Sequence, residues 1–263
     1  MYRYFFKRII DFFGALVLLV VLSPLLLIVC ILEIIFHGWP VTFRQRRVGK
    51  GQKVFWFYKF RSMSNKRDAN GDLLPDKQRL TKFGKFIRKT SIDELPQLWN
   101  ILKGDMSFIG PRARDIKECV FYNDQQCGRF RIKPGISGLA QVNGRNSITF
   151  EKIAEYDNIY ADKITFWGDV KIVFKTFWVV LFGKSGIESQ TQTTNHVGGC
   201  YYNDLLLQRG DITREEYDKR VAFSKTLNVG AIMPSIDAQR KSEAAAMLAE
   251  GLAVLHKKTS ETA

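Results

Sequence analysis

The sequence has few of the residues that hold metal ions or form disulfide bonds, with 4 Cys and 3 His among 263 residues. The cysteines form no C-x-x-C pair and the histidines have no ligand spacing; they are Cys30, Cys119, Cys127, Cys200, His37, His196 and His256. This scarcity argues against a zinc site and a disulfide framework. A reducing compartment is the simplest environment for such a chain.

Several motifs of common enzyme and binding classes are also missing. The chain has no G-x-x-x-x-G-K-[ST] or G-x-G-x-x-G run, so P-loop kinases, ATPases and Rossmann enzymes lack their signatures here. No internal repeat and no recognisable nucleic-acid motif occurs. No small-residue cleavage pattern follows the N-terminal apolar run, and we therefore expect that run to stay in the mature protein.

What the sequence does have is an excess of positive charge in one part of the chain. Residues 1–187 hold 31 Lys and Arg against 16 Asp and Glu, whereas residues 188–263 hold 9 against 10. A basic, aromatic-rich region attached to a membrane favours anionic lipid headgroups or phosphorylated substrates as partners. Nucleic acid is not expected as a partner, because the chain has a membrane segment and lacks recognisable nucleic-acid-binding motifs.

The longest apolar run, residues 12–36, is interrupted at its centre by Ser23-Pro24 and is basic on both sides. About 20 apolar residues are enough to cross a bilayer. Pro24 removes a helical N–H and clashes with the Val20 carbonyl, which predicts a kink, and the Ser23 hydroxyl is able to bond a freed carbonyl. A single crossing favours Lys and Arg on one side only. Two interpretations stay open here: a kinked single-span anchor, and a re-entrant helix that leaves on the face it entered.

Hydrophobic patterns predict mixed secondary structure after this run. The expected elements are strands over 41–43 and 54–58, a surface loop over 64–79, helices over 81–89, 93–102, 115–131 and 149–161, and a rigid loop over 134–138.

Helices are predicted on both sides of a linker in the last third of the chain, and this linker contains Gly183, Gly186 and a Thr/Gln-rich stretch. Residues 166–182 are interpreted either as a core helix or as an in-plane helix at the membrane interface, with its aromatic residues Trp167, Phe174, Phe177, Trp178 and Phe182. From about residue 201 we expect a helix, a turn and a helix, with Thr213 and Glu216 as a capping box. An Ala-rich helix is expected over 242–258.

The most informative local feature is the segment 91–96, Ser-Ile-Asp-Glu-Leu-Pro, which places two adjacent acids inside a basic stretch. Pro96 lacks an N–H and belongs in the first turn of a helix, so a helix is expected to start near Asp93. One interpretation is structural: the acids complement the helix dipole, and Ser91 with Glu94 forms a capping box.

The other interpretation is a phosphate-handling site. Basic segments that suit phosphate occur elsewhere in the chain, at Lys59, Arg88, Arg112 and Arg145. An ionised carboxylate can attack phosphorus and form an acyl phosphate, while Mg²⁺ held by a carboxylate and the substrate phosphates neutralises the charge. Adjacent acids on a helix point about 100° apart, so one is expected to be the nucleophile and the other the metal ligand.

Residues 1 to about 187 closely resemble the small monotopic polyprenol-phosphate phosphoglycosyl transferases of the bacterial sugar transferase family. The motifs that carry the resemblance, in chain order, are KRIID from Lys7, LSP from Leu22, YKFRSM from Tyr58, SIDELPQLWN from Ser91, LKGDMSFIGPR from Leu102, KPGISG from Lys133, QVNGR from Gln141, YD from Tyr156 with Tyr160, and DVKI from Asp169.

The resemblance implies an α+β, mainly helical fold. Residues 188–263 lie outside the resemblance and are expected to form a helical appendage. The resemblance divides the rest into a re-entrant membrane helix hairpin over 1–40 and a cytoplasmic catalytic domain over 41–187 with interfacial amphipathic helices. It places the protein on the cytoplasmic face of the bacterial inner membrane and favours re-entry over a single span.

The resemblance also implies the reaction. A UDP-sugar gives its sugar-1-phosphate to undecaprenyl phosphate, UMP is released and a polyprenyl diphosphate sugar forms. By resemblance Asp93 is the nucleophile and Glu94 the Mg²⁺ ligand. The substrate-binding residues implied are Lys59, Arg88, Arg112, Arg145 and Asp157. Which UDP-sugar is used stays open.

Two other functions are carried as alternatives. One is a membrane-anchored, non-catalytic scaffold for anionic lipid or UDP-sugar, which the intact acid pair argues against. The other is an Asp-nucleophile phosphatase-like hydrolase, which lacks its D-x-D signature near Asp93. The appendage is longer than in the minimal family members, and it is expected to dimerise the enzyme or to dock a downstream glycosyltransferase.

Overall fold

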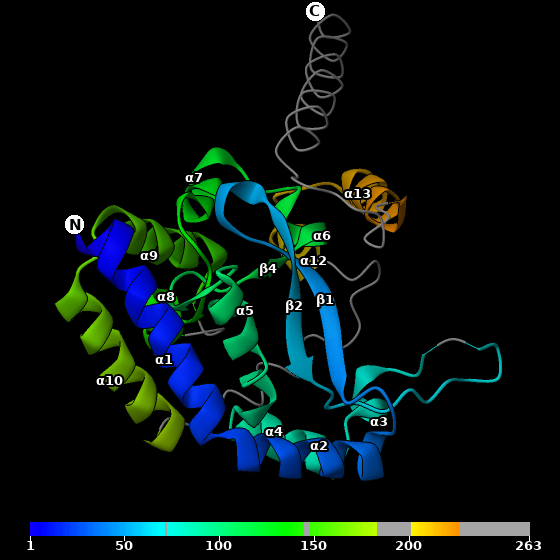
Figure 1. The fold of residues 1–263 in the computed structure, drawn as a ribbon. Coiled ribbons are helices and arrows are strands. Elements are labelled where there is room, and N and C mark those ends of the chain that lie inside the picture. The colour runs from blue at the N-terminus through cyan, green and yellow to red at the C-terminus, as the bar shows by residue number, and fades with distance from the viewer. Residues whose placement is uncertain (72, 145–147, 183–200, 227–263) are drawn as a thin grey trace, which may run out of the picture.

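The computed structural model describes residues 1–71, 73–144, 148–182 and 201–226 (Figure 1). Its helices are α1 (Lys7–Val21), α2 (Ser23–His37), α3 (Asp76–Arg79), α4 (Lys82–Lys89), α5 (Gln97–Lys103), α6 (Ile116–Cys119), α7 (Asp124–Cys127), α8 (Leu139–Val142), α9 (Phe150–Asp162), α10 (Phe166–Phe182), α12 (Tyr201–Arg209) and α13 (Arg214–Thr226). A π-helical turn η1 (Tyr2–Phe6) and 3₁₀ turns η2 (Lys50–Gln52), η3 (Ile92–Glu94) and η4 (Gly128–Arg131) complete the helical elements.

The strands form two small sheets. They are β1 (Thr42–Val48), β2 (Val54–Phe60), β3 (Ser107–Ile109), β4 (Arg114–Asp115) and β5 (Gly135–Ser137). The first sheet is antiparallel in the order β2-β1-β4, and the second is a parallel pair of β3 and β5. A mainly helical α+β fold was predicted, and the structure has one.

The N-terminal helix bends where the sequence predicts. Two helices separated by Leu22 replace the single run, and the bend between them is 64°. The Ser23 hydroxyl donates a hydrogen bond to the Val20 carbonyl at 2.7 Å, so the carbonyl freed by Pro24 is satisfied locally. Among the described residues no single helix has the length and apolar composition to cross a membrane, whereas this bent pair meets both requirements when taken together.

Both ends of the bent pair are tied to the rest of the chain. Near its start, Lys7 forms an ion pair with Asp169 on α10 at 2.6 Å. At its end, the buried His37 ring contacts Glu33 on α2 and the Thr81 hydroxyl before α4, each at 2.8 Å. The Glu33 contact has the i, i+4 spacing of a helix, whereas the Thr81 contact could not be predicted from the sequence, because Thr81 lies 44 residues away along the chain.

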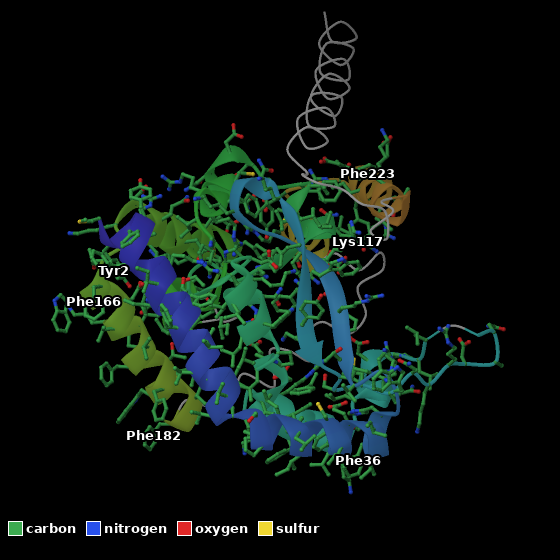
Figure 2. The ribbon with its side chains drawn as sticks, viewed as in Figure 1. Tyr2, Phe36, Lys117, Phe166, Phe182 and Phe223 are labelled. Carbon is green, nitrogen blue, oxygen red and sulfur yellow. The ribbon has the colours of Figure 1, made fainter. Side chains whose placement is uncertain are left out.

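Helix α10 shows that one interpretation of residues 166–182 is wrong. Its aromatic side chains are 67–73% exposed, namely Trp167, Phe174, Phe177, Trp178 and Phe182, so this is not a core helix. Figure 2 shows Phe182 on α10 and Phe36 on α2 at the lower edge of the molecule. The apolar faces of α1, α2 and α10 remain uncovered by the rest of the described chain.

Four local predictions differ from the structure. The surface loop expected over 64–79 ends in the short helix α3. The helix expected over 115–131 is divided into α6, α7 and η4, because Asn123 forms a capping box with Gln126 and starts a new helix. The rigid loop over 134–138 contains β5. The capping box expected at Thr213 is present on one side, where the Thr213 hydroxyl accepts from the Glu216 N–H at 3.2 Å.

The core lies on both sides of the larger sheet. Helix α1 packs on α5 and β2 through Ala15, Leu98 and Phe57. A second cluster joins Ile116 on α6 to Leu206 on α12, so the described part of the appendage packs on the same body as the sheet.

The domain boundaries at 40 and 187 stay predictions, and the helix expected over 242–258 lies outside the described residues.

Candidate active site

The acid pair lies on a 3₁₀ turn, not on a regular helix as predicted. Turn η3 holds Asp93 and Glu94 between α4 and α5, and α5 begins only after Pro96. Ser91 before the turn has a left-handed backbone, with φ 57°, and its side chain makes no capping bond. The capping-box interpretation of Ser91 and Glu94 is therefore wrong, and both carboxylates are available for other contacts.

One cavity of about 1060 Å³ brings the predicted site residues together. Lys59 comes from the end of β2, Arg88 from the end of α4, and Arg112 from the segment after β3. The predicted residues that line this cavity are Lys59, Arg88, Asp93, Glu94, Arg112 and Asp157. Arg145 lies outside the described residues.

The Glu94 carboxylate is held by two cations. Its Oε1 atom lies 2.9 Å from Lys59 Nζ and 2.8 Å from Arg112 Nη2. Burial of the carboxyl raises its pKa, but the charges and hydrogen bonds of Arg112 and Lys59 outweigh burial and hold the pKa of Glu94 far below its ordinary value. Glu94 is therefore a fixed anion at neutral pH.

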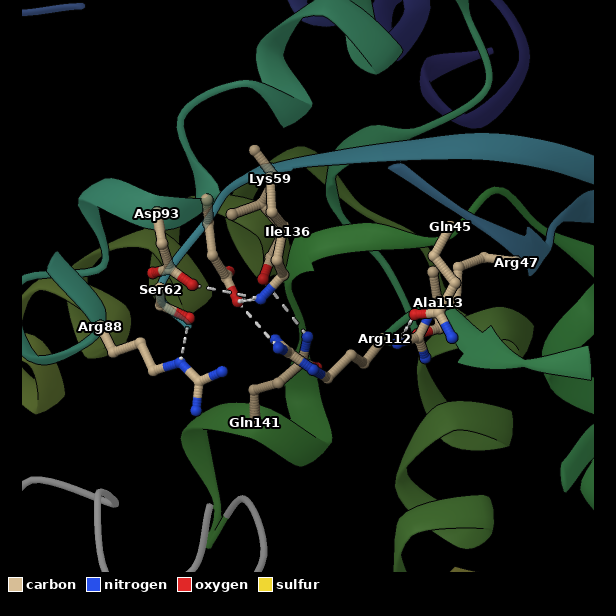
Figure 3. Close-up of polar contacts among 11 residues, drawn as sticks. Gln45, Arg47, Lys59, Ser62, Arg88, Asp93, Arg112, Ala113, Ile136 and Gln141 are labelled. Carbon is tan, nitrogen blue, oxygen red and sulfur yellow. Dashed lines mark hydrogen bonds and ion pairs between the residues drawn. The ribbon is translucent and has the colours of Figure 1, made fainter. Parts of the chain in front are cut away.

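Asp93 has a different environment. Its Oδ2 atom lies 3.4 Å from Lys59 Nζ, and the side chain is 9% exposed (Figure 3). Burial raises the pKa of Asp93, the positive charge of Lys59 opposes this, and the neighbouring Glu94 charge adds to the increase. The two adjacent carboxyls are thus electrostatically distinct: one is tightly paired, and the other is weakly paired and more basic, as suits a nucleophile.

Arg88 lies near Asp93 and lines the same cavity as Arg112 (Figure 3). Its Nε atom donates to the Ser62 hydroxyl at 2.7 Å. Burial lowers the pKa of Arg88, but a guanidinium stays charged in proteins. Within the described ranges no carboxylate forms an ion pair with Arg88, so its charge is available for a bound anion.

Asp157 is paired with a residue that the sequence analysis missed. Arg129 Nη2 lies 3.0 Å from Asp157 Oδ2, and the two side chains are 4% and 2% exposed. The same nitrogen donates to the Arg112 carbonyl at 2.7 Å. Asp157 therefore positions Arg129, and Arg129 in turn holds the backbone carbonyl of Arg112. A buried carboxylate such as Asp157 requires a cationic partner. The sequence alone does not show which of the many Lys and Arg residues is that partner.

The Glu94 carboxylate also fits a magnesium ion. The described residues contain no group of three His, Cys, Asp or Glu side chains that could hold a metal. Magnesium, however, is commonly bound by one or two carboxylates together with substrate phosphates. Both cations on Glu94 contact Oε1, and its second oxygen takes part in none of these contacts. Glu94 can thus supply a carboxylate oxygen while a phosphorylated substrate supplies the other ligands.

Comparison with known proteins adds an independent finding. The sequence model of the family described as bacterial sugar transferase matches residues 2–183. The uncharacterized sugar transferase EpsL of Bacillus subtilis is 46% identical over 191 residues, which are 73% of this chain and 92% of EpsL.

Two relatives have names that state a reaction. The undecaprenyl-phosphate galactose phosphotransferase of Salmonella typhimurium is 38% identical over 194 residues, 67% of this chain and 40% of that protein. The UDP-N-acetylgalactosamine-undecaprenyl-phosphate N-acetylgalactosaminephosphotransferase of Aeromonas hydrophila is 40% identical over 191 residues, 68% of this chain and 44% of that protein. The chain spans less than half of these two proteins. With the family model matching most of its length, the chain belongs to the bacterial sugar transferase family, whose polyprenol-phosphate phosphoglycosyl transferases its motifs resemble.

Proposed function

We propose that this protein transfers a sugar-1-phosphate from a UDP-sugar to undecaprenyl phosphate, releasing UMP and forming a polyprenyl diphosphate sugar. The observation that carries the proposal is the single cavity in which Asp93 and Glu94 meet Lys59, Arg88 and Arg112. The names of two relatives support the donor and acceptor classes. The proposal places the protein at a membrane step of bacterial polysaccharide or other glycoconjugate assembly.

The reaction proceeds in two displacements at one phosphorus. An oxygen of the Asp93 carboxylate bonds to the sugar-bearing phosphorus, and the bond to the bridging oxygen breaks. The bridging oxygen keeps the electron pair and leaves with UMP. An oxygen of undecaprenyl phosphate then bonds to the same phosphorus, and the Asp93 carboxylate leaves. Arg88 and Arg112 hold the phosphate oxygens in both displacements, since a guanidinium can bind two of them.

Glu94 would hold Mg²⁺ together with the substrate phosphates. The bound ion would neutralise charge on the diphosphate and so favour attack by an anion. Lys59 and Arg112 keep Glu94 ionised and fix its position.

The acceptor reaches the site from a membrane in this proposal. Helices α1, α2 and α10 offer the uncovered apolar surface that a bilayer would bury, and α2 packs on α4 through Val29 and Ile87. Because α4 carries Arg88, the site is directly connected to this surface. We infer a re-entrant, monotopic attachment to the cytoplasmic face of the inner membrane.

Two alternatives are separable from this proposal by their products. A non-catalytic scaffold would bind a UDP-sugar without releasing UMP. A hydrolase would release sugar phosphate or inorganic phosphate without a lipid acceptor. The charges around Asp93 favour a reactive site over a scaffold. A more basic carboxylate beside Arg88, which has no carboxylate partner among the residues the structure describes, suits attack on an anion.

The test uses the full chain in nanodiscs with a panel of UDP-sugars. The wild type is expected to release UMP, and a donor labelled in its sugar phosphate is expected to label the protein transiently until undecaprenyl phosphate is added. Asp93→Asn is expected to abolish both labelling and turnover. Full turnover in Asp93→Asn would exclude the covalent route, and UMP release from no donor in the panel would exclude the transferase.

A further inference from the structure

The cavity has a second polar region that the proposed reaction does not yet use. We call it the distal lobe and define it as Gln45, Arg47, Arg114, Asp115 and Glu118, all of which line the cavity. Gln45 and Arg47 are two residues apart on β1 and so point to the same face of the strand. Strand β4 pairs beside them, with Arg47 opposite Asp115.

The distal lobe lies across Arg112 from the nucleophile. Figure 3 shows Asp93 and Arg88 on one side of Arg112, and Gln45 and Arg47 on the other. The Arg112 side chain reaches Glu94 at 2.8 Å, while the backbone of the next residue, Ala113, accepts from Arg47 Nη1 at 3.4 Å. A ligand bound at Arg112 can therefore extend from the acid pair into the distal lobe.

The side chains of the distal lobe are held in place by one another. Arg47 Nη2 donates to Gln45 Oε1 at 2.8 Å, and the Gln45 amide donates to Asp115. The guanidinium groups also lie over rings, Arg47 5.5 Å from the Phe57 centroid and Arg114 5.1 Å from that of Phe150. A preorganised set of charges binds a ligand at a smaller entropic cost than a mobile one.

Several buried polar atoms of the distal lobe are not satisfied by these contacts. Arg47 Nε, Arg114 Nε and Glu118 Oε2 have no hydrogen-bond partner within the part of the chain that the structure describes. The Arg114 guanidinium and the Glu118 carboxylate are 3.7 Å apart, which is an ion pair but a loose one. Buried polar atoms without partners are costly, so the lobe gains from any rearrangement on ligand binding that gives these atoms partners.

We propose that the distal lobe binds the nucleoside monophosphate that leaves the donor, with Arg47 and Arg114 at its phosphate and Asp115 and Glu118 at its ribose hydroxyls. This inference rests on the proposed use of a nucleotide-sugar donor. Attacking and leaving oxygens lie roughly in line in phosphoryl transfer, so the leaving group extends away from Asp93. That direction leads past Arg112. The phosphate that departs gains negative charge, which two further arginines stabilise.

Binding of UMP to the purified full chain in nanodiscs tests the proposal. Arg114→Gln is expected to raise the Kd for UMP about tenfold, and Arg114→Lys is expected to recover part of the loss, because it restores the charge but not the fork. The KM for undecaprenyl phosphate is expected to stay at its wild-type value, since the acceptor does not occupy the lobe. The matched control is Arg44→Gln on the same strand, where the guanidinium lies over Trp56 instead and does not line the cavity.

A second arm tests the carboxylates. The wild type is expected to bind UMP more tightly than 2′-deoxyuridine monophosphate, and Asp115→Asn is expected to reduce this preference several-fold. Asn keeps the oxygen with which Asp115 accepts from the Lys117 N–H, so the start of α6 is preserved. Melting temperatures of all variants check that they are folded.

The outcomes separate the inference from the function on which it rests. A wild type that binds neither UMP nor UDP would overturn the proposed donor class. A wild type that binds UMP, with unchanged Kd in folded Arg114→Gln, would overturn the distal lobe alone. If Arg114→Gln left the Kd for UMP unchanged but weakened binding of the intact UDP-sugar, the distal lobe would hold the sugar. This result would also overturn the proposal that the lobe binds the nucleoside monophosphate.

Discussion

At the scale of single residues, adjacent carboxyls differ because their partners differ. Glu94 receives both Lys59 and Arg112 on one oxygen, whereas Asp93 has one longer contact to Lys59. Their pKa values move in opposite directions for this reason. Carboxyls whose environments separate their pKa values commonly take different roles in one reaction.

Replacement of Lys59 tests how its charge sets the pKa of Asp93, through the pH dependence of covalent labelling. The Lys59 charge lowers the pKa of Asp93 against the effect of burial, and attack requires the ionised form. In Lys59→Met the pKa of Asp93 is therefore higher, and as the pH falls, covalent labelling by the donor is expected to fail at a higher pH than in the wild type. Rates of labelling across the acidic range measure the shift, with the exposed Lys53→Met as control. If labelling of Lys59→Met failed at the same acidic pH as labelling of the wild type, Lys59 would not lower the pKa of Asp93.

The metal role of Glu94 has its own test. Glu94→Gln keeps the shape but removes the anion, and we expect about a 100-fold or greater loss of turnover with a higher Mg²⁺ concentration for half-maximal rate. Chelation of Mg²⁺ should stop the wild type reversibly. Glu155→Gln, an exposed acid on α9, is the control. Unchanged Mg²⁺ dependence in Glu94→Gln would remove Glu94 from the metal site.

At the scale of elements, the described helices of the C-terminal segment contribute to the core. Leu206 on α12 and Val221 on α13 are buried in the same cluster as Ile116 and Cys119 on α6. Helix α6 follows directly after Arg114 and Asp115 of the distal lobe. A role of the appendage in assembly stays a prediction, whereas its described part packs on α6, an element that lines the cavity.

Truncation of a single side chain measures this support. Leu206→Ala is expected to lower the free energy of unfolding by about 2–4 kcal/mol, because it leaves a cavity in a packed cluster. Gln208→Ala, an exposed position on the same helix, is expected to change it by less than about 0.5 kcal/mol. Chemical denaturation in detergent gives both values. Equal stability of the two variants would show that α12 does not stabilise the core.

At the scale of the whole molecule, the bent helix pair returns to the body from which it starts. Lys7 contacts Asp169 near its first turn, and His37 contacts Thr81 at its last turn. A straight span would carry these two ends to opposite sides of a bilayer. Contacts of both ends with one body support re-entry over the single-span anchor.

Labelling of introduced cysteines tests the topology. Tyr4→Cys lies at an exposed position before the bend, and Leu73→Cys lies at an exposed position after it. In a background without the native cysteines, both are expected to resist a membrane-impermeant maleimide in intact spheroplasts and to react after lysis. A periplasmic marker protein controls for access. Reaction of Tyr4→Cys in intact spheroplasts would overturn re-entry.

The local sequence determined features that depend on neighbouring residues. Ser23-Pro24 bends the helix because a missing N–H and a ring clash act within one turn. The strands around residues 42–60 and helices α4, α9 and α10 follow from local periodicity. The motifs identified the family and its acid pair, and six of the seven predicted site residues line one cavity, the seventh lying outside the described residues.

Only the tertiary structure decided what depends on contacts between distant segments. The sequence could not predict the partner of Asp157 or the assembly of the distal lobe from β1, β4 and α6, since charge pairing is set by the fold as a whole. It also left two interpretations of α10, and only its exposure in the fold decided between them. Sequence placed Asp93 and Glu94 at a helix start. Packing put them on a 3₁₀ turn, where cations from β2 and from the segment after β3 give the two carboxyls different properties.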